Sequence, residues 1–474
     1  MNRESIFFHS ILAATIVVAA CAPVWAAGPT KPNILFIVGD DMGYADVGFH
    51  GCTDIPTPNL DVLATAGVRF TNGYVSGPYC SPTRAGLMTG RYQTRFGHEF
   101  NPARGSIGLP LAEKTIADRL KAAGYITGLV GKWHLGAEPE FHPLKRGFDE
   151  FYGFLGGAHD YFKSAGILRG TEPMTELDYT TDAFAREAIA FLERHKAESW
   201  FLYLAFNAVH TPMQATDDRL AKFPNVADGR RRTYDAMMLA MDEAIGRVRR
   251  KIAEAGLEQN TLVCFISDNG GPTMPGTSVA GSENNPLRGS KRTTLEGGIR
   301  VPFIVSWPGH LKPGVFSHPS IQLDLTVTAL TAAGVQPGRD WKLEGVNLLP
   351  HLTGEKNGTP HEALYWRFGQ QMAIRVGDFK LVRYDNNADT RTGRRNQGVT
   401  PVKLYNLRDD IGETKDLAAA MPDKVKELQS RWDAWNATNV KPLWGGDQTD
   451  NDGAEPGAPL PKKGKNAKSA SGGN

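Results

Sequence analysis

Short apolar runs alternate with segments of helical periodicity from residue 33 onward, and this alternation constrains the fold of the chain more than any other sequence feature. Five runs have the length of strands: 34–38, 126–130, 201–206, 262–267 and 301–306. Helical patterns cover 115–123, 182–195 and 233–255, with Gly124 and Gly256 as left-handed caps after the first and last. Strands that alternate with helices predict an α/β fold with a mostly parallel sheet.

The pattern changes past about residue 365, where short strands follow one another. Residues 372–376 and 379–382 are joined through a Gly-Asp pair, 403–406 reads as another strand, and a helix is expected over 423–435. We expect a large domain over 31–364 and a smaller antiparallel subdomain over 365–440 that a helix closes. Residues 441–474 are too polar to bury a core and are expected to be a disordered tail.

Composition excludes several classes of protein. The 474 residues are 41% hydrophobic and 22% charged, which are globular values and exclude wholesale disorder, a fibrous repeat or a multi-span membrane protein. Lys and Arg number 53 against 51 Asp and Glu, a formal charge of +2, so nothing favours a nucleic-acid partner.

The N-terminus indicates export. An apolar run over 11–20 precedes small residues at 24–27, which predicts a cleaved signal peptide over 1–26 and a periplasmic or secreted protein. The run is too short for a permanent span, which needs about 20 residues. Residues 18–21 also resemble a lipoprotein box, so lipidation at Cys21 is the alternative that would tether the chain to a membrane.

Cysteine usage argues against a disulfide framework. Of Cys21, Cys52, Cys80 and Cys264, the last three remain after signal removal, and an odd number cannot all pair. Cys264 lies in an apolar run and is expected to be a small buried hydrophobe. Cys80 does not lie in an apolar run, so burial as a small hydrophobe does not explain why a cysteine stands there.

Polar side chains follow the strand ends, where open α/β sheets place their functional groups. Asp40 and Asp41 follow the first strand, and Asp268 and Asn269 follow the fourth. If these ends are neighbours, the four side chains supply the oxygen ligands that Ca²⁺ or Mg²⁺ prefers. Alternatively, each pair only begins a turn or caps a helix.

Cationic side chains follow the other strands. Lys132 and His134 come after the second strand, His210 after the third, and Lys291 precedes the fifth. A lysine ammonium binds sulfate or phosphate oxygens, and a histidine can pass a proton to a leaving oxygen near neutral pH. Taken singly, each could equally be a surface lysine or a satisfied histidine.

The segment from Cys80 to Arg91 (CSPTRAGLMTGR) is the most specific. Pro82 predicts a helix that begins just after Cys80, which places Cys80 at the positive helix end with Arg84 one turn on. The segment resembles the Cys-x-Pro-Ser/Thr-Arg and Thr-Gly-Arg signature of type I sulfatases, the arylsulfatase family of the alkaline phosphatase-like superfamily. The resemblance runs from residue 31 to about 438, and its further motifs appear in family order.

This resemblance implies a fold and an activity. It implies a large mixed sheet flanked by helices, with residues 31–364 as the catalytic domain, and hydrolysis of sulfate monoesters. Members of the family have the signature cysteine oxidised to Cα-formylglycine by a dedicated maturation enzyme, which would explain an unpaired Cys80. The hydrated aldehyde offers one hydroxyl to attack sulfur and a second to drive release of sulfate.

The resemblance also implies residue roles. It implies Ca²⁺ held by Asp40, Asp41, Asp268 and Asn269, with residue 80 close to it. Arg84 would hold the gem-diol, and Lys132 would bind the sulfate and residue 80. Lys291 and His210 would bind sulfate and protonate the leaving oxygen, while His134 assists elimination, and Asp268 would also help to deprotonate the attacking hydroxyl.

Substrate recognition is less constrained. Export and resemblance to enzymes of sulfated sugars favour a sulfated carbohydrate, with aryl sulfates as surrogates. Loops 96–104, 138–145, 157–163 and 273–288 carry side chains that could bind sugar or stabilise the loops: His98, Asn101, His142, His159, Asp160, Asn285 and, just beyond, Arg292. The alternatives are a phosphoester or phosphonate ester hydrolase of the same superfamily, a noncatalytic sulfoglycan-binding protein, or a structural exported protein.

Overall fold

The structure is a computed structural model that describes residue 1 and residues 31–102, 107–274, 279–388 and 398–444. The predicted signal peptide and Cys21 lie outside the described residues. No helix within the described ranges is both long and apolar enough to cross a membrane. One compact unit begins at Lys31 and holds all the elements below.

A ten-stranded mixed sheet forms the centre of this unit, in the order β11-β2-β10-β9-β1-β8-β4-β5-β6-β7. The strands are β1 Asn33–Gly39, β2 Val68–Phe70, β4 Ile126–Lys132, β5 Glu150–Phe154, β6 Leu168–Arg169, β7 Glu172–Pro173, β8 Trp200–Ala205, β9 Thr261–Ser267, β10 Phe303–Ser306 and β11 Gly314–Phe316. The five central strands β9, β1, β8, β4 and β5 are parallel to one another. Four of them were predicted as strands of a mostly parallel sheet, and β5 was not. The fifth predicted strand begins at Phe303 rather than at residue 301, and it runs antiparallel to β9.

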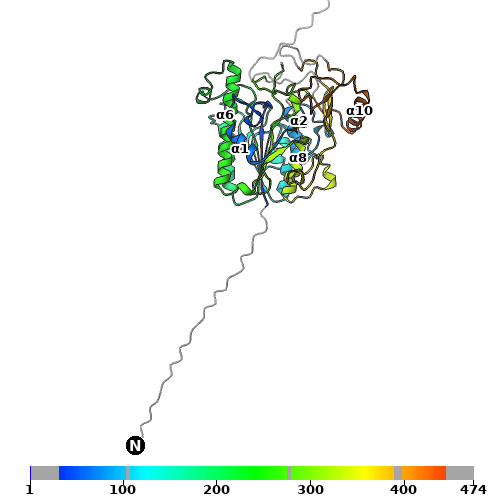
Figure 1. Cartoon of the computed structure of the whole chain (residues 1–474). Helices are drawn as coiled ribbons and strands as arrows, with labels where there is room; N and C mark the ends of the chain where they lie inside the picture. The colour runs from blue at the N-terminus through cyan, green and yellow to red at the C-terminus, as the bar shows by residue number, and fades with distance from the viewer. Residues whose placement is uncertain (2–30, 103–106, 275–278, 389–397, 445–474) are drawn as a thin grey trace, which may run out of the picture. The chain divides into compact units, whose positions relative to one another are not determined.

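Helices cover both faces of the sheet, as Figure 1 shows with α1 and α6 on one side of the strands and α2 and α8 on the other. The helices are α1 Pro58–Ala66, α2 Cys80–Thr89, α3 Ile116–Ala122, α4 Thr180–His195, α5 Asp217–Leu220, α6 Gly229–Glu254, α7 Glu296–Ile299, α8 Leu323–Ala332, α9 Leu349–Leu352 and α10 Pro422–Asn436. Successive residues of β1 point to opposite faces: Ile37 packs with α4 and α6, whereas Phe36 packs with α2, α3 and α8. The left-handed caps at Gly124 and Gly256 are confirmed, with φ of 86° and 70°.

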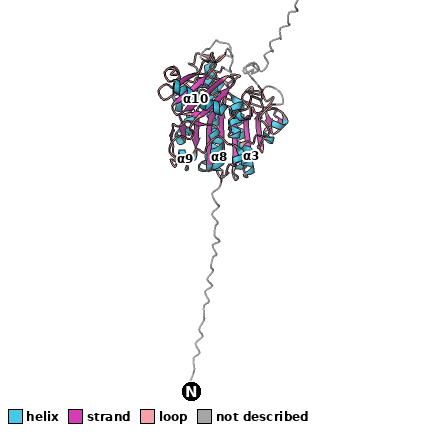
Figure 2. Ribbon diagram, turned by 90° about the vertical axis from the view of Figure 1, so that its right-hand side faces the viewer, coloured by secondary structure: helices cyan, strands magenta, loops and turns pink. Residues whose placement is uncertain are grey.

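The smaller antiparallel sheet has the order β13-β14-β15-β16, from β13 Leu364–Phe368, β14 Gln371–Val376, β15 Phe379–Arg383 and β16 Lys403–Asn406. The predicted hairpin is confirmed, since Val376 pairs with Phe379 around Gly377, whose φ is 56°. Figure 2 shows α10 against this sheet. Leu404 and Trp366 share one apolar cluster with Tyr74 of the two-stranded sheet of β3 Gly73–Tyr74 and β12 Ser320–Ile321, so the small sheet is packed into the large part.

The described chain ends at Trp444, beyond the predicted start of the tail. The Leu443 N–H donates to the Gly97 carbonyl at 2.9 Å, and Trp444 Nε1 donates to the Phe100 carbonyl at 3.0 Å. Residues 441–444 are therefore held by these hydrogen bonds, and the rest of the predicted tail lies outside the described residues. Of the cysteines in the described ranges, Cys52, Cys80 and Cys264 are all free, and Cys264 is a buried strand residue as predicted.

Candidate active site

Two adjacent strand ends bring the predicted acidic side chains together. β1 and β9 are parallel with Gly39 opposite Ser267, so the residues that follow each strand meet at one edge of the sheet. Asp41 has a φ of 64°, and its Oδ1 accepts a 2.7 Å hydrogen bond from Asn269 Nδ2. Asp40 and Asp268 are as fully buried as this pair. The strand order therefore turns two separate sequence pairs into one polar cluster.

Cys80 lies at the first residue of α2, beside that cluster. Its sulfur, one carboxylate oxygen each of Asp40 and Asp41, and a ring nitrogen of His210 all lie within 4.8 Å of one another, close enough to surround one metal ion. The helix begins at Cys80 rather than after it, and Pro82 is its third residue; this is tolerated because the first four helical N–H groups have no intrahelical acceptor. Burial raises the pKa of the Cys80 thiol, which keeps an unmodified thiol protonated and weakly nucleophilic.

Three buried cations face the three carboxylates. Lys132 Nζ lies 2.5 Å from Asp40 Oδ2, and Lys291 Nζ lies 2.9 Å from Asp41 Oδ1. Arg84 Nη2 lies 2.8 Å from Asp268 Oδ2. Burial alone would lower the pKa of Lys132, but Asp40, Cys80 and Asp268 together outweigh burial and raise the pKa, so Lys132 stays charged. The cluster is close to electrically neutral without any bound ion.

The two predicted histidines enter from different strands. His210 follows β8, and its Nδ1 is 2.7 Å from the Thr211 carbonyl, which can only accept. Nδ1 therefore carries a proton, and Nε2 is the atom that faces the cluster, 3.5 Å from Asp41 Oδ2. His134 follows β4 with a φ of 58°, and its backbone N–H donates to the Leu155 carbonyl.

Two buried oxygens suit a metal ion. Asp40 Oδ1 and Asn269 Oδ1 have no hydrogen-bond partner among the described residues, which is costly unless another group contacts them. Burial and the Asp40 carboxylate raise the pKa of Asp268, a sign that negative charge is crowded there. Oxygen donors of this kind fit Ca²⁺ or Mg²⁺ better than zinc. The residues present thus fit the predicted metal.

Comparison with known families agrees with this geometry. A family model described as Sulfatase matches residues 32–335, and one described as N-sulphoglucosamine sulphohydrolase, C-terminal, matches residues 289–431. The chain belongs to the sulfatase family.

Individual relatives extend over most of this sulfatase. The N-acetylgalactosamine-6-sulfatase of Canis lupus familiaris is 34% identical over 467 residues, which cover 87% of each chain. Arylsulfatase A of Homo sapiens is 34% identical, covering 88% of this chain and 89% of the relative. These findings confirm a type I sulfatase of the alkaline phosphatase-like superfamily and a sulfuric ester hydrolase.

Solved structures confirm the predicted fold. Ps i-CgsB in complex with k-i-k-neocarrahexaose has a TM-score of 0.80 at 38% identity, covering 88% of the sulfatase and 95% of that chain. The phosphonate monoester hydrolase of Agrobacterium radiobacter has a TM-score of 0.63 at 20% identity, covering 86% and 96%, and shows the shared fold alone.

Some residues beside the site were not predicted in their observed roles. Ser81 Oγ donates to the His134 carbonyl at 2.6 Å and lies 2.6 Å from His98 Nε2. Asn101 Oδ1 accepts from the Ser81 N–H at 3.1 Å. His98 and Asn101 were candidates for sugar contacts, but both are buried against the start of α2. Tyr203, whose hydroxyl accepts from Arg84 Nη1, had no sequence signal beyond its place in an apolar strand.

The other substrate-loop candidates serve partly local contacts. His142 Nδ1 accepts from the Leu144 N–H, and His159 Nδ1 contacts the Asp160 carbonyl. Arg292 stacks on the Tyr79 ring, with its guanidinium carbon 5.1 Å from the ring centre. Residues 103–106 and 275–278 of these loops lie outside the described residues.

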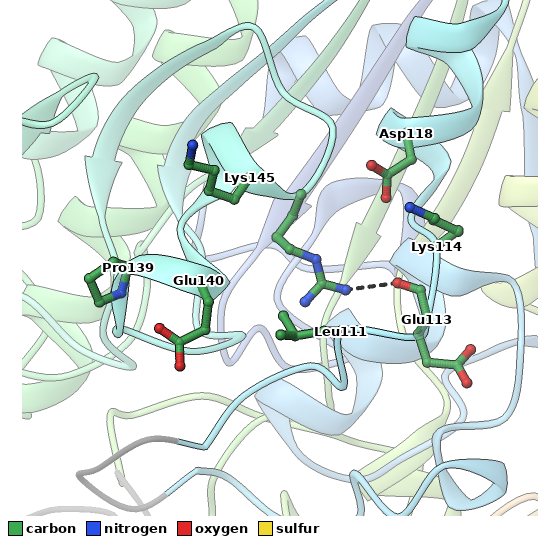
Figure 3. Close-up of a pocket in the computed structure, with 8 residues that line it drawn as sticks. Leu111, Glu113, Lys114, Asp118, Pro139, Glu140 and Lys145 are labelled. Atoms are coloured by element: carbon green, nitrogen blue, oxygen red, sulfur yellow. Dashed lines mark hydrogen bonds between the residues drawn. The ribbon is translucent and has the colours of Figure 1, made fainter.

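A cavity of about 540 Å³ lies apart from the catalytic candidates, since none of them lines it. Figure 3 shows Glu140 and Lys145 on one side and Glu113, Lys114 and Asp118 on the other. Arg146 also lines the cavity, and its Nη2 donates to the Glu113 carbonyl at 2.8 Å. Its lining mixes both charges and includes a hydrogen-bonded arginine, so the chemistry of the sulfatase belongs to the strand-end cluster instead.

Proposed function

We propose that this sulfatase is exported and hydrolyses sulfate monoesters on a carbohydrate, with Cys80 converted to Cα-formylglycine and Ca²⁺ held by Asp40, Asp41, Asp268 and Asn269. The observation that carries the proposal is the free, buried Cys80 at the start of α2 among three carboxylates and three cations. Residues 31–364 would form the catalytic domain, with 365–440 as the subdomain packed on it.

Names of relatives support the substrate class. One relative is named for N-acetylgalactosamine 6-sulfate hydrolysis, and one solved neighbour was determined with k-i-k-neocarrahexaose bound. Both point to a sulfated sugar as the natural substrate. An aryl sulfate would serve as a surrogate, because recognition of the sulfate group is separate from recognition of the alcohol.

The charge balance of the site supports an anionic substrate. Three carboxylates and three cations cancel, so a divalent cation on the orphaned oxygens of Asp40 and Asn269 would leave a net positive cluster. Lys132 and Lys291 would then stabilise charge on the sulfate oxygens. A preorganised group of this kind contributes about 2.7–4 kcal/mol to transition-state stabilisation in analogous oxyanion sites.

Proton transfer falls to the histidines. The Thr211 carbonyl holds one proton of His210 on Nδ1. Nε2 would carry the second proton of the imidazolium and give it to the leaving alcohol oxygen. His134 would assist the later release of sulfate, and Arg84 would orient residue 80. When present, the hydrated aldehyde supplies an oxygen nucleophile and a second hydroxyl, and the calcium ion supplies Lewis-acid charge stabilisation.

Phosphoester or phosphonate ester hydrolysis is the second candidate, and it is favoured only by the shared fold of the phosphonate monoester hydrolase. The metal candidates are carboxylate and amide oxygens rather than a histidine-rich set, which supports sulfate. A noncatalytic sulfoglycan-binding protein would keep the lysines but leave Cys80 unmodified.

Mass spectrometry of the tryptic peptide that contains residue 80 tests the proposal. Protein made together with a formylglycine-generating enzyme should carry a residue about 18 Da lighter than cysteine. The same protein should release nitrophenol faster from its sulfate ester than from its phosphate ester. An unmodified thiol without turnover would overturn the proposal, and faster phosphate turnover would favour the second candidate. Secretion of the full chain with loss of residues 1–26 would test export.

A further inference from the structure

His134 is held by its backbone on both sides. Its φ of 58° lies in the left-handed region, where a residue with a side chain stays only if surrounding contacts hold it. Its N–H donates to the Leu155 carbonyl at 3.1 Å, and its own carbonyl accepts from Ser81 Oγ at 2.6 Å. These two hydrogen bonds hold the backbone of His134, so the backbone cannot move freely to relieve a steric clash with the ring.

The hydrogen bond from Ser81 has a defined direction. A backbone carbonyl only accepts, so the Ser81 hydroxyl must donate its single proton to His134. The 2.6 Å contact between Ser81 Oγ and His98 Nε2 then requires Nε2 to donate. His98 is fully buried, so this short chain of hydrogen bonds connects the loop after α2 to the backbone of His134.

The ring of His134 lies against a glycine of the loop that follows β5. A Cβ built on Gly157 would lie 2.5 Å from His134 Nε2 and 2.7 Å from Cε1, closer than any real contact. A Cβ on the neighbouring Gly156 would have the Ala158 carbonyl at 3.9 Å as its nearest neighbour. Neither glycine has a left-handed φ, so alanine is conformationally allowed at both positions.

We propose that Gly157 is a positioning residue for His134: its missing side chain leaves the space that the imidazole needs to face the sulfate site. The inference rests on the proposed function, because it assumes that His134 acts on the sulfate. The three atoms nearest to a methyl group at residue 157 all belong to the His134 ring, which is the far end of a side chain, so the ring rotates away while the fold is kept. Gly157 acts through His134 alone.

Steady-state kinetics on the matured full-length sulfatase test this, with nitrophenyl sulfate as the substrate. Gly157→Ala should lower kcat about 100-fold, the typical cost of displacing a catalytic group by about 1 Å. KM and the melting temperature should stay close to wild type, and mass spectrometry should show residue 80 fully converted. Gly156→Ala, the matched control, should leave kcat unchanged.

A double-mutant cycle decides whether Gly157 acts through His134. Once His134→Ala has removed the ring, adding Gly157→Ala should have no further effect on kcat. An equal loss in both backgrounds would overturn the inference, as would wild-type kcat in Gly157→Ala. If Gly157→Ala instead lowers the melting temperature, the inference requires His134→Ala to restore it. Wild-type kcat in His134→Ala would overturn the role of His134 itself, while sulfate turnover and conversion of Cys80 would still stand.

Discussion

At the residue scale, the candidate metal site depends on the hydrogen bonds that single buried atoms make. Asn269 uses its nitrogen to bind Asp41, which leaves its carbonyl oxygen without a hydrogen-bond partner among the described residues. Sequence could predict that Asp40, Asp41, Asp268 and Asn269 meet, because adjacent parallel strands end together. It could not predict which oxygens stay unpaired, since this depends on side-chain rotations fixed by neighbours such as Arg84.

Asn269→Ala should remove the stabilisation that calcium gives the folded protein. A ligand at 100 times its Kd raises the free energy of unfolding by about 2.7 kcal/mol, so calcium should raise the melting temperature of the wild type. Thermal unfolding in calcium and in a chelator measures this. Asn260→Ala, far from the site, is the control and should respond like wild type. If calcium raised the melting temperature of Asn269→Ala as much as that of Asn260→Ala, Asn269 would not be a calcium ligand.

His98 should make stability depend on pH in a defined direction. Burial lowers its pKa to about 3, against about 6.5 in the unfolded chain, so the unfolded state binds more protons between these values. The stabilisation is complete above pH 6.5 and is lost as the pH falls toward 3. His98→Gln should remove up to about 1.4 kcal/mol per pH unit of that slope. Urea unfolding from pH 4 to 7 would measure it.

His361 is a contrasting control for that experiment. Burial opposes its charge, but Asp324 at 2.8 Å outweighs burial and raises its pKa. Its stabilisation is present below pH 6.5 and is lost as the pH rises through the raised pKa. His361→Asn should therefore remove a slope of opposite sign that lies above pH 6.5, so the urea series for this variant has to extend above pH 7. If His98→Gln and His361→Asn changed the pH dependence of the unfolding free energy in the same direction, the description of one of the two histidine environments would be wrong.

The start of α2 is the decisive feature at the element scale. Its N-cap residue, Tyr79, makes no side-chain cap, and Asn101 instead accepts from the Ser81 N–H at 3.1 Å from a separate loop. Local sequence signals a cap only within a few residues of the helix, so this contact was beyond prediction. The loop that caps α2 is also the loop that holds His98.

Asn101→Ala should cost about 1 kcal/mol of stability, the typical loss of a helix cap. It should also lower kcat, because Ser81 adjoins residue 80. Asn101→Asp keeps an acceptor oxygen in place and should retain more of both properties. Urea unfolding and nitrophenyl sulfate kinetics would compare the variants. Equal losses in the alanine and aspartate variants would argue against a capping role.

The sequence predicts secondary structure well where a strand is buried on both faces, because such a strand is a continuous apolar run. The runs 34–38 and 262–266 are apolar throughout because helices cover both faces of the sheet. β5 was missed, since Glu150 and Gly153 interrupt its aromatic residues. The antiparallel direction of β10 was missed too, because direction depends on the path of the connecting chain rather than on the strand itself.

At the scale of the whole molecule, one lysine joins the large and small sheets. Lys380 of β15 lies 2.8 Å from Glu296 of α7 and 2.9 Å from Glu413, with all three side chains buried. Burial and the neighbouring Glu296 raise the pKa of Glu413 to about 7, although Lys380 opposes the shift. These contacts, together with the shared apolar cluster, make the two sheets one packed body.

Lys380→Met should destabilise this body by about 3–5 kcal/mol, because it removes the cation beside the buried Glu413 and leaves Glu296 with Arg300 at 3.2 Å. A single urea transition that shifts as a whole would show that the two sheets unfold together. Lys424→Met removes a partly exposed ion pair of α10 and should cost less than about 1 kcal/mol. Similar losses in both variants, or an early separate transition, would contradict the description of one body.

The strand order also governs when the sheet can form during synthesis. β1 is made first but pairs with β8 and β9, so the centre of the sheet cannot close before Ser267 has left the ribosome. Roughly 190 residues separate Cys80 from that point, and a ribosome adds about 5–20 residues per second. Cys80, fully buried once folded, would remain in an unfolded segment for about 10–40 s. An enzyme that modified this cysteine would therefore have access to it before the sheet closes and buries it.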